Sequence, residues 1–454
     1  MLFLPYFLMM MMGVRSWSPS SWREKVPYQL PQYPDPIALQ HTEEILRTKS
    51  PLIFSGECQR LKHQLGMASQ RQGFVLVGGD CAETFDEFSA NKVRDDFRLL
   101  LQMSLVLGYG CGLPITQIAR TAGQFGKPRS EDTETLFNTT LPSYRGDIVN
   151  GASFHALSRI PDPQRMLSAY HQSVQTLNLI RAFIQGGFSN IDRLQDWELI
   201  STKTDATYLD TLQQVKRCLQ FMHSMDIKAS SRIDRFFTGH ECLLLPYEEA
   251  LTRTDSLTGR YLDCSAHFLW LGERTRYLDG AQVEFLRGVM NPIGIKISAS
   301  TSIGELLEIL DVLNPDLEPG KITLFSRMGK AKIATALPSI IRAVEASRHR
   351  NNVLWCCDPM HGNTFTKDGI KTRSMKDIRE ELFMFFDIHK DLGTFPGGIH
   401  LEMTSGNVTE CIDHPLIPIT DSFLRGYKST CDPRLSGSQA LEMAFIISQR
   451  LLSQ

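Results

Sequence analysis

The sequence has no surplus of charge of either sign and no apolar run long enough to cross a membrane. Its 454 residues carry 48 Lys and Arg against 50 Asp and Glu, a net charge of −2. This balance excludes a general attraction for nucleic acid or for an anionic membrane surface, so any basic site must be local. The apolar run at the start, Met1–Met12, is shorter than the about 20 residues that a membrane-spanning helix needs.

A compact cysteine framework is also missing. The 10 cysteines are scattered along the chain, which is typical of reduced thiols in an intracellular protein, one or two of them functional. There is no low-complexity tract and no interior hinge rich in Gly and Ser. We therefore expect a single catalytic domain over residues 17–454, in the cytoplasm or an organelle. Residues 1–16 are expected to be a misassigned start or a weak targeting segment.

Eight short apolar runs are present, and a residue that can bind a metal or a phosphate, or carry a proton, comes late in each. The runs are Gly73–Glu83, Leu113–Gln124, Phe237–Leu245, Ser265–Arg274, Asn291–Ser298, Lys321–Gly329, Asn352–Asn363 and Pro396–Thr404. Their late reactive residues are Cys81, Arg120, Glu241, Arg274, Lys296, Arg327, His361 and Glu402. In an eight-stranded parallel barrel, catalytic side chains lie at the C-terminal ends of the strands. The pattern predicts an α/β fold, a (β/α)8 TIM barrel, with its active site at that end.

Two additions to the barrel are expected. Trp17–Asp35 is rich in Pro, Ser and Trp and predicts an extended arm lying over the body. Between about 131 and 235, apolar residues recur at three- and four-residue spacing, for example in Gln164–Gln185 and Tyr208–Met225, which predicts helices inserted after the second strand. The other predicted helices are Ala38–Arg47, Ser55–Gln70, Gly280–Arg287, Ile303–Leu313, Ala331–Ala346, Thr372–Lys390 and Ser438–Leu451.

Four residues with metal-binding side chains lie in short turns that are far apart in the sequence: Cys81, His361, Glu402 and Asp432. A thiolate, an imidazole and two carboxylates suit a divalent transition ion such as Mn²⁺, Co²⁺, Fe²⁺ or Zn²⁺ rather than Ca²⁺. No local motif such as Cys-x-x-Cys accompanies them, and each residue taken singly is more often structural. They form a site only if the fold brings them together.

Cations follow several of the buried runs, where they would lie at the barrel mouth rather than on solvated helical faces. The cations are Arg120, Lys127, Arg129, Arg274, Lys296 and Arg327. The carboxylate of Glu273 stands next to Arg274 in the sequence. Arg offers a planar fork and Lys a point charge for binding phosphate. Two groups of cations indicate two phosphate-bearing substrates, or one substrate with two phosphates. A metal-dependent hydrolase of a phosphorylated sugar is the alternative that these residues leave open.

Ten motifs in order carry a resemblance to a known family. They are GGDCAE, RTAGQFGKPRS, LPSYRGDIVN, GHECLLLPYE, SAHFLWLGERTR, NPIGIK, SRMG, WCCDPMHGNT, IHLEMTSGNVTEC and CDPRLSGSQ. From Trp17 to the C-terminus the chain resembles the class II 3-deoxy-D-arabino-heptulosonate 7-phosphate (DAHP) synthases of plants and microbes. The resemblance implies a 3-deoxy-7-phosphoheptulonate synthase, a transferase. It would condense phosphoenolpyruvate, erythrose 4-phosphate and water to DAHP and phosphate in the first step of the shikimate pathway, which leads to chorismate and the aromatic amino acids.

The resemblance also implies roles for individual residues. The metal ligands would be Cys81, His361, Glu402 and Asp432, and the ion Mn²⁺ or Co²⁺, with Fe²⁺, Zn²⁺ and Cd²⁺ as alternatives. Phosphoenolpyruvate would bind to Arg120, Glu273, Arg274, Lys296 and Arg327, of which Glu273, Arg274 and Lys296 would be catalytic. Lys127, Arg129 and Ser130 would bind erythrose 4-phosphate. A homo-oligomer is expected, with no nucleic acid partner and no stable membrane association.

The chain departs from the family pattern at a few positions. Ile297, Ser298 and Ala299 stand where the family usually has Val-Gly-Pro, Gln282 where it usually has His, and Ser436 where it tends to have Asn. Two other hypotheses stay open: a non-catalytic paralogue, and the same reaction feeding a secondary-metabolite pathway. Feedback control by aromatic amino acids and the role of the His240–Glu241 pair are not fixed by the sequence.

Overall fold

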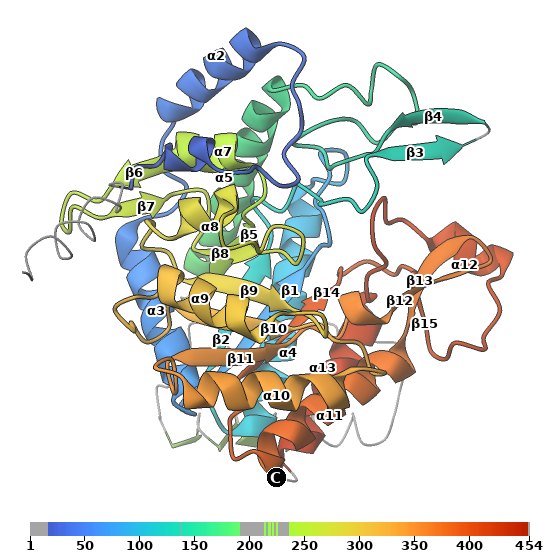
Figure 1. Cartoon of the computed structure of the whole chain (residues 1–454). Helices are drawn as coiled ribbons and strands as arrows, with labels where there is room; N and C mark the ends of the chain where they lie inside the picture. The colour runs from blue at the N-terminus through green and yellow to red at the C-terminus, as the bar shows by residue number, and fades with distance from the viewer. Residues whose placement is uncertain are drawn as a thin grey trace, which may run out of the picture.

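Eight parallel strands close a barrel in the order β1, β14, β11, β10, β9, β8, β5, β2 (Figure 1). The computed structural model describes residues 17–136, 138–190 and 236–452, with a few residues between 213 and 225. The barrel strands are β1 (Phe74–Gly79), β2 (Ile115–Arg120), β5 (Phe237–Glu241), β8 (Phe268–Leu271), β9 (Ile293–Ile297), β10 (Ile322–Ser326), β11 (Val353–Cys357) and β14 (Gly398–Glu402). Each strand lies within one of the eight apolar runs, so the predicted (β/α)8 barrel is confirmed.

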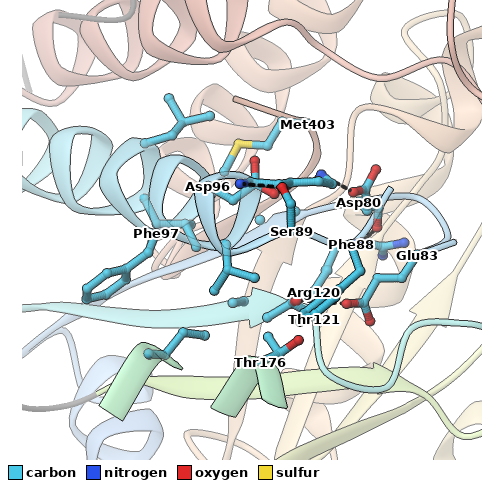
Figure 2. A pocket seen from close by; sticks show the side chains of 18 of the residues that line it. Asp80, Glu83, Phe88, Ser89, Asp96, Phe97, Arg120, Thr121, Thr176 and Met403 are labelled. Carbon is cyan, nitrogen blue, oxygen red and sulfur yellow. Dashed lines mark hydrogen bonds and ion pairs between the residues drawn. The ribbon is translucent and has the colours of Figure 1, made fainter. Parts of the chain in front are cut away.

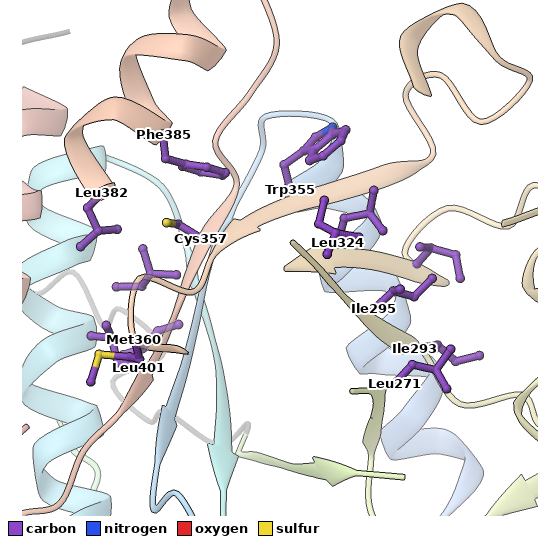
Figure 3. Close-up of a cluster of buried hydrophobic side chains, with 14 of the residues drawn as sticks. Leu271, Ile293, Ile295, Leu324, Trp355, Cys357, Met360, Leu382, Phe385 and Leu401 are labelled. Atoms are coloured by element: carbon purple, nitrogen blue, oxygen red, sulfur yellow. The ribbon is translucent and has the colours of Figure 1, made fainter. Parts of the chain in front are cut away.

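Side chains alternate along each strand between the barrel interior and the surrounding helices. In β9, Ile293, Ile295 and Ile297 face outward into the main hydrophobic core, part of which is drawn in Figure 3. Lys296 faces inward, where its ammonium lies 4.6 Å from the centre of the Phe325 ring. The same alternation turns the last inward residue of each strand toward the barrel mouth.

The barrel interior is a packed core below that mouth. Val75, Ile118, Phe268, Phe325 and other inward residues form one buried cluster. Helix α3 (Ser55–Ser69) contributes to the same cluster and packs against β1, β2 and β11. The interior is therefore filled, and the chemistry is left to the C-terminal ends of the strands.

Helices surround the barrel on the outside (Figure 1). They are α4 (Ala90–Cys111), α5 (Gln164–Gln185), α7 (Leu245–Leu251), α8 (Ala281–Leu286), α9 (Ile303–Leu313), α10 (Ile333–Ala346), α11 (Met375–Asp391) and α13 (Gly437–Leu452). Ser89, Ser302 and Ser374 cap α4, α9 and α11 by accepting a hydrogen bond from a backbone N–H of the first turn, which satisfies a donor that the helix leaves free. None of the helices in the described ranges is long and apolar enough to cross a membrane.

The segment before the barrel lies over the body, as expected. It contains a 3-10 turn at Ser21–Glu24 and helix α2 (Pro36–Arg47). The indole N–H of Trp17 donates to the backbone carbonyl of Glu284 on α8 at 2.8 Å, and that of Trp22 to Glu249 on α7 at 2.9 Å. Residues 1–16 lie outside the described part of the chain.

The first part of the predicted helical insertion is wrong. The residues after β2 form a hairpin of β3 (Thr133–Leu136) and β4 (Thr139–Pro142), with Thr133 opposite Pro142. β-branched Thr favours strands, and Asn138 has φ of 62°, a conformation that Asn tolerates in tight turns. Helix α5 follows at the predicted residues. Of the predicted helix at Tyr208–Met225, eight residues between 213 and 225 are described, and all of these but Met225 are helical.

A small sheet stands beside the mouth, with two strands from the segment between β11 and α11 and one from the segment after β14. Its strands are β12 (Thr364–Lys367), β13 (Ile370–Ser374) and β15 (Cys411–Ile412), in that order. The predicted helix at Thr372–Lys390 therefore begins three residues late, because Thr372, Arg373 and Ser374 belong to β13 and pair with β12 or β15. The remaining short elements are β6 (Thr252–Thr254), β7 (Tyr261–Asp263), the 3-10 helix η3 (His361–Asn363) and α12 (Asp421–Gly426).

Candidate active site

Glu402, the last residue of β14, is the centre of the site. Its carboxylate is fully buried. Oε1 lies 3.1 Å from Arg120 Nη2, 3.1 Å from His361 Nε2 and 3.5 Å from Lys127 Nζ, while Oε2 accepts from Arg373 at 2.7 Å. Burial alone would raise the pKa of Glu402, but His361, Lys127 and Arg373 hold it well below its usual range. Glu402 is therefore an anion at neutral pH.

Three of the four predicted metal ligands come together. One ligand atom from each of His361, Glu402 and Asp432 lies within 4.8 Å of the others. Asp358 accepts from Nδ1 of His361 at 2.8 Å, which turns Nε2 toward Glu402 and fixes the tautomer that a ligand needs. Burial raises the pKa of Asp432, but Lys127, whose ammonium is 2.7 Å away, acts together with Arg373 and His361 to lower the pKa overall. An imidazole beside two ionised carboxylates fits a divalent ion of the Mn²⁺ type.

Cys81, the fourth predicted ligand, does not belong to this group of three. Its thiol is buried in a small cluster with Ala82, Tyr144 and Cys431, and Sγ lies 3.6 Å from Ser429 Oγ. A hydrogen bond from the Cys431 thiol, aided by nearby Lys127, lowers the pKa of Cys81 despite its burial. The role of Cys81 as a ligand stays a prediction.

Arg120 and Lys296 are held on the floor of the mouth by His400, which lies between them. Arg120 Nη1 is 2.7 Å from His400 Nε2, and Lys296 Nζ contacts both His400 Nδ1 and Asp358. Both cations also lie over the ring of Trp270, at 5.1 Å and 5.9 Å from its centre. Burial lowers the pKa of Lys296 to about 8, although Asp358 opposes the shift.

The remaining predicted phosphoenolpyruvate residues lie on the rim. Glu273 accepts from Arg276 at 3.2 Å and from Ser298 at 2.8 Å. Arg274 donates to Ser130 at 2.6 Å, which connects the two predicted substrate groups. The Nε atom of Arg327 is buried and has no hydrogen-bond partner among the described residues.

The predicted erythrose 4-phosphate residues follow β2 along one loop. Lys127 points inward to Asp432, Arg129 pairs with Glu134 of β3 at 2.6 Å, and Ser130 meets Arg274. The two predicted substrate groups share one cavity of about 380 Å³ with His361 and Asp432 of the ligand group. Its lining includes Arg120, Lys127, Arg129, Ser130, Glu273, Arg274, Lys296, Arg327, His361 and Asp432. Glu402 is fully buried and is not part of the lining.

Glu241, left unassigned by the sequence, also lines this cavity. Its Oε1 is buried and accepts no hydrogen bond from the described residues. A Cβ on Gly272 would stand 2.0 Å from that oxygen, so glycine at this position leaves room for the carboxylate. The neighbouring His240 faces away from the cavity lining and contacts buried Glu248 at 2.8 Å.

A second, smaller cavity lies behind the first, between β1, β2, α4 and α5 (Figure 2). Asp80 and Asp96 line it and share Lys92, at 2.8 Å and 2.9 Å. The backbone carbonyl of Asp80 accepts from Arg120 Nε at 2.8 Å. The paired charges of this cavity therefore help to fix Arg120 in the larger one.

Sequence reasoning missed three residues that organise the site: Asp358, His400 and Arg373. Asp358 and His400 lie within motifs already singled out, and His400 is two residues before Glu402, the spacing that puts both on the inner face of a strand. That spacing was a signal that could have found His400. Arg373 had no such signal, because it was expected within a helix.

Comparisons with known proteins identify the family of the chain. The model of the class-II DAHP synthetase family matches residues 17–448. The phospho-2-dehydro-3-deoxyheptonate aldolase of Streptomyces coelicolor is 43% identical over 440 residues, which cover 96% of this chain and 97% of that protein. The protein of the same name from Neurospora crassa is 43% identical over 452 residues, covering 95% and 94%.

Two further relatives carry the same enzyme name. The aldolase AroG of Mycolicibacterium smegmatis is 41% identical over 429 residues, covering 92% of this chain and 91% of that protein. A solved structure of the aldolase from Francisella tularensis covers 91% of this chain and 97% of its own at 13% identity and a TM-score of 0.46, which is too low to add support. Because the family model spans almost the whole sequence and three relatives are at least 41% identical along nearly their full lengths, the chain belongs to the class-II DAHP synthetase family.

Proposed function

We propose that the chain joins phosphoenolpyruvate to erythrose 4-phosphate in a reaction that depends on a divalent metal ion. Family membership makes the chain a 3-deoxy-7-phosphoheptulonate synthase, the predicted enzyme class. The observation that carries the metal-dependent mechanism is one cavity whose lining holds the rim and floor cations together with His361 and Asp432, while buried Glu402 has a ligand atom within 4.8 Å of one from each of these two. A hydrolase of one sugar phosphate would not need two separate groups of cations.

Two buried cations, Arg120 and Lys296, and two cations on the rim, Arg274 and Arg327, hold the enolic substrate. Arg120, Arg274, Lys296 and Arg327 line the same cavity and together supply the charge for one phosphate and one carboxylate. The hydrogen bonds that Arg120 makes to the Asp80 carbonyl and His400 restrict its orientation before substrate arrives. A fixed approach of the two substrates lowers the barrier, because orientation is settled before the reaction.

The phosphate of erythrose 4-phosphate would bind to Lys127, Arg129 and Ser130. In that position the aldehyde of the same substrate would point toward the proposed metal ligands. A divalent ion held by His361, Glu402 and Asp432, with Cys81 nearby, would polarise that aldehyde as a Lewis acid. C3 of phosphoenolpyruvate then attacks the carbonyl carbon, C2 gains cationic character, water adds at C2, and phosphate leaves.

Glu273 is the group that we assign to the water proton. Its Oε1 is fixed by Arg276 and Ser298, and its Oε2 is buried and accepts no hydrogen bond from the described residues. An oriented carboxylate with one free oxygen in a substrate cavity can accept a proton from water. Arg276 also donates to the backbone carbonyl of Lys296 at 3.0 Å, which keeps the base next to the enolic substrate.

The test is consumption of phosphoenolpyruvate in the presence of erythrose 4-phosphate. Purified full-length protein is assayed after chelation and again after Mn²⁺ or Co²⁺ is restored. We expect no turnover after chelation and recovery with the metal. Turnover that survives complete chelation would contradict the metal mechanism, and absence of turnover with every ion would contradict the reaction itself.

A further inference from the structure

Arg373 is a charged side chain with no access to solvent, and it lies outside the barrel. Its exposure is 0%, and it belongs to β13 in the small sheet beside the mouth. A buried guanidinium is destabilising unless it is paired and hydrogen-bonded. Its partners therefore indicate what the side chain is for.

Two of those partners belong to, or lie next to, the proposed metal ligands His361, Glu402 and Asp432, which we call the metal group. Nη1 donates to Glu402 Oε2 at 2.7 Å and also to the backbone carbonyl of Pro433, the residue after Asp432. Nε donates to Thr364 Oγ1 on β12 at 2.8 Å. One guanidinium thus joins the side chain of one proposed ligand to the backbone beside another, and the sheet supplies its anchor.

The contact also decides which oxygen of Glu402 faces the group. Arg373 occupies Oε2, whereas Oε1 lies 3.1 Å from His361 Nε2. Without Arg373 the carboxylate could rotate and exchange its two oxygens. Lys371 precedes Arg373 by two residues on the same strand and lies 3.5 Å from Asp432 Oδ1, so residues at alternate positions of β13 reach the same group.

We propose that Arg373 is a positioning residue for the metal group, holding Glu402 with Oε1 toward His361 and fixing the backbone next to Asp432. The proposal rests on the proposed metal-dependent function. Partners that orient a ligand typically change metal affinity by 10- to 100-fold when they are removed. A purely structural arginine would change stability alone.

The experiment measures Mn²⁺ binding to the full-length protein without substrate, from the electron paramagnetic resonance signal of the free ion. The variants are Arg373→Lys, which keeps the charge but cannot bridge the same three acceptors, and Thr364→Val, which removes the Nε acceptor together with the hydrogen bond at 3.3 Å from Thr364 to the Met360 carbonyl. We expect the Kd for Mn²⁺ to rise about 10- to 100-fold in Arg373→Lys and by less in Thr364→Val. Thermal unfolding in chelator shows separately how far each variant is destabilised.

Lys321→Met is the matched control. Lys321 is also a buried cation, but it lies at the start of β10 and donates to the carbonyls of Val289 and Asn291, at the opposite end of the barrel from the site. We expect this variant to lower Tm and to leave the Kd for Mn²⁺ unchanged. Wild-type affinity in both Arg373→Lys and Thr364→Val would overturn the positioning role. Absence of Mn²⁺ binding in the wild type would instead overturn the proposed metal function, so the two failures are distinguishable.

Discussion

Lys296 is a buried cation whose charge depends on pH in the working range. Burial lowers its pKa to about 8, so above that pH the free enzyme loses one positive charge from the proposed phosphoenolpyruvate site. We expect kcat/KM for phosphoenolpyruvate to fall about tenfold per pH unit above the break. Lys296→Arg, which stays charged, should remove the break in the pH profile, and an unchanged break in that variant would contradict the assignment.

The same shift has a consequence for stability. The folded pKa lies below the ordinary value of 10.5, so between about pH 8 and 10.5 the unfolded chain holds this proton and the folded chain does not. The contribution of Lys296 to the free energy of unfolding therefore rises with pH through that window and is smallest below it. Denaturant unfolding of wild type and Lys296→Met at pH 7 and pH 10 measures the difference.

Ser298 is a residue at which this chain departs from the family pattern and gains a contact. Its hydroxyl donates to Glu273 at 2.8 Å, which the glycine usual at this position could not do. Ser298→Ala removes one hydrogen bond to a charged group, worth about 1.5 to 3 kcal/mol, while Arg276 still holds the carboxylate. We expect kcat to fall about tenfold with little change in KM for phosphoenolpyruvate. An equal rise in KM would show that Ser298 acts in binding instead.

Cys81 is the proposed ligand that the geometry leaves outside the group of three. Cys81→Ser replaces a thiol with an alcohol, which ionises far less readily and binds metals poorly. We expect most activity and most Mn²⁺ affinity to be lost. Cys218→Ser, at an exposed cysteine, is the matched control and should behave as wild type. Full activity in Cys81→Ser would remove Cys81 from the metal site.

Site residues could be predicted from the sequence only where the sequence pattern that marks them lies within a single segment. Glu402 and Lys296 were found because each ends an apolar run, and a strand carries such a residue to the barrel mouth. Arg373 was missed because its burial results from pairing between β13 and β15, strands separated by a helix and a barrel strand in the sequence. Pairing between distant segments leaves no periodicity in either one.

At the scale of elements, the loop after β2 is held by one carboxylate. Glu83 accepts from the hydroxyl of Thr121 at 2.8 Å and from the backbone N–H groups of Ala122, Gly123 and Gln124 at 2.9 to 3.0 Å. The loop continues to Lys127, so this carboxylate connects the turn that carries Cys81 to the proposed erythrose 4-phosphate site. An acceptor with four donors restricts the loop far more than its sequence of small residues would.

Replacing that carboxylate should loosen the loop. Glu83→Gln keeps the shape, but its amide nitrogen can only donate and faces N–H donors. We expect kcat/KM for erythrose 4-phosphate to fall about 10- to 100-fold, since a lost buried charge-assisted bond is worth about 1.5 to 3 kcal/mol. Steady-state kinetics in both substrates measures it, with Glu308→Gln on the exposed face of α9 as the control. An equal loss for both substrates would indicate a general distortion of the mouth.

The elements themselves were predictable where they are long or fully buried. Helices α5 and α9 begin and end at the predicted residues, because their apolar spacing extends over several turns. The β3–β4 hairpin could not be predicted from the sequence, since its strands have four residues each and are largely exposed. Four residues span only about two strand periods and one helical period, too few to tell one pattern from the other. The pairing of Thr135 with Thr140 is visible only in the fold.

At the scale of the whole molecule, the proposed metal should stabilise the fold. A ligand that binds only the folded state at 100 times its Kd raises the free energy of unfolding by about 2.7 kcal/mol. We expect Tm in Mn²⁺ to exceed Tm in chelator, and Ca²⁺ to produce a smaller shift. Calorimetry of the wild-type protein measures both. An identical Tm in Mn²⁺ and in chelator would contradict a metal site built from His361, Glu402 and Asp432.

The closure of the barrel places the first strand beside the last. Gly79 of β1 lies opposite Arg120 of β2 on one side and Glu402 of β14 on the other. During synthesis, a nascent chain that has not yet emerged as far as β14 has one unpaired edge on β1, of the kind that invites aggregation. It also lacks the carboxylate around which the cations gather. The nascent protein can therefore acquire neither a protected edge nor a working centre until almost all of it has left the ribosome. Pairing of β14 protects the edge and brings in Glu402, and Asp432 completes the proposed centre only afterwards.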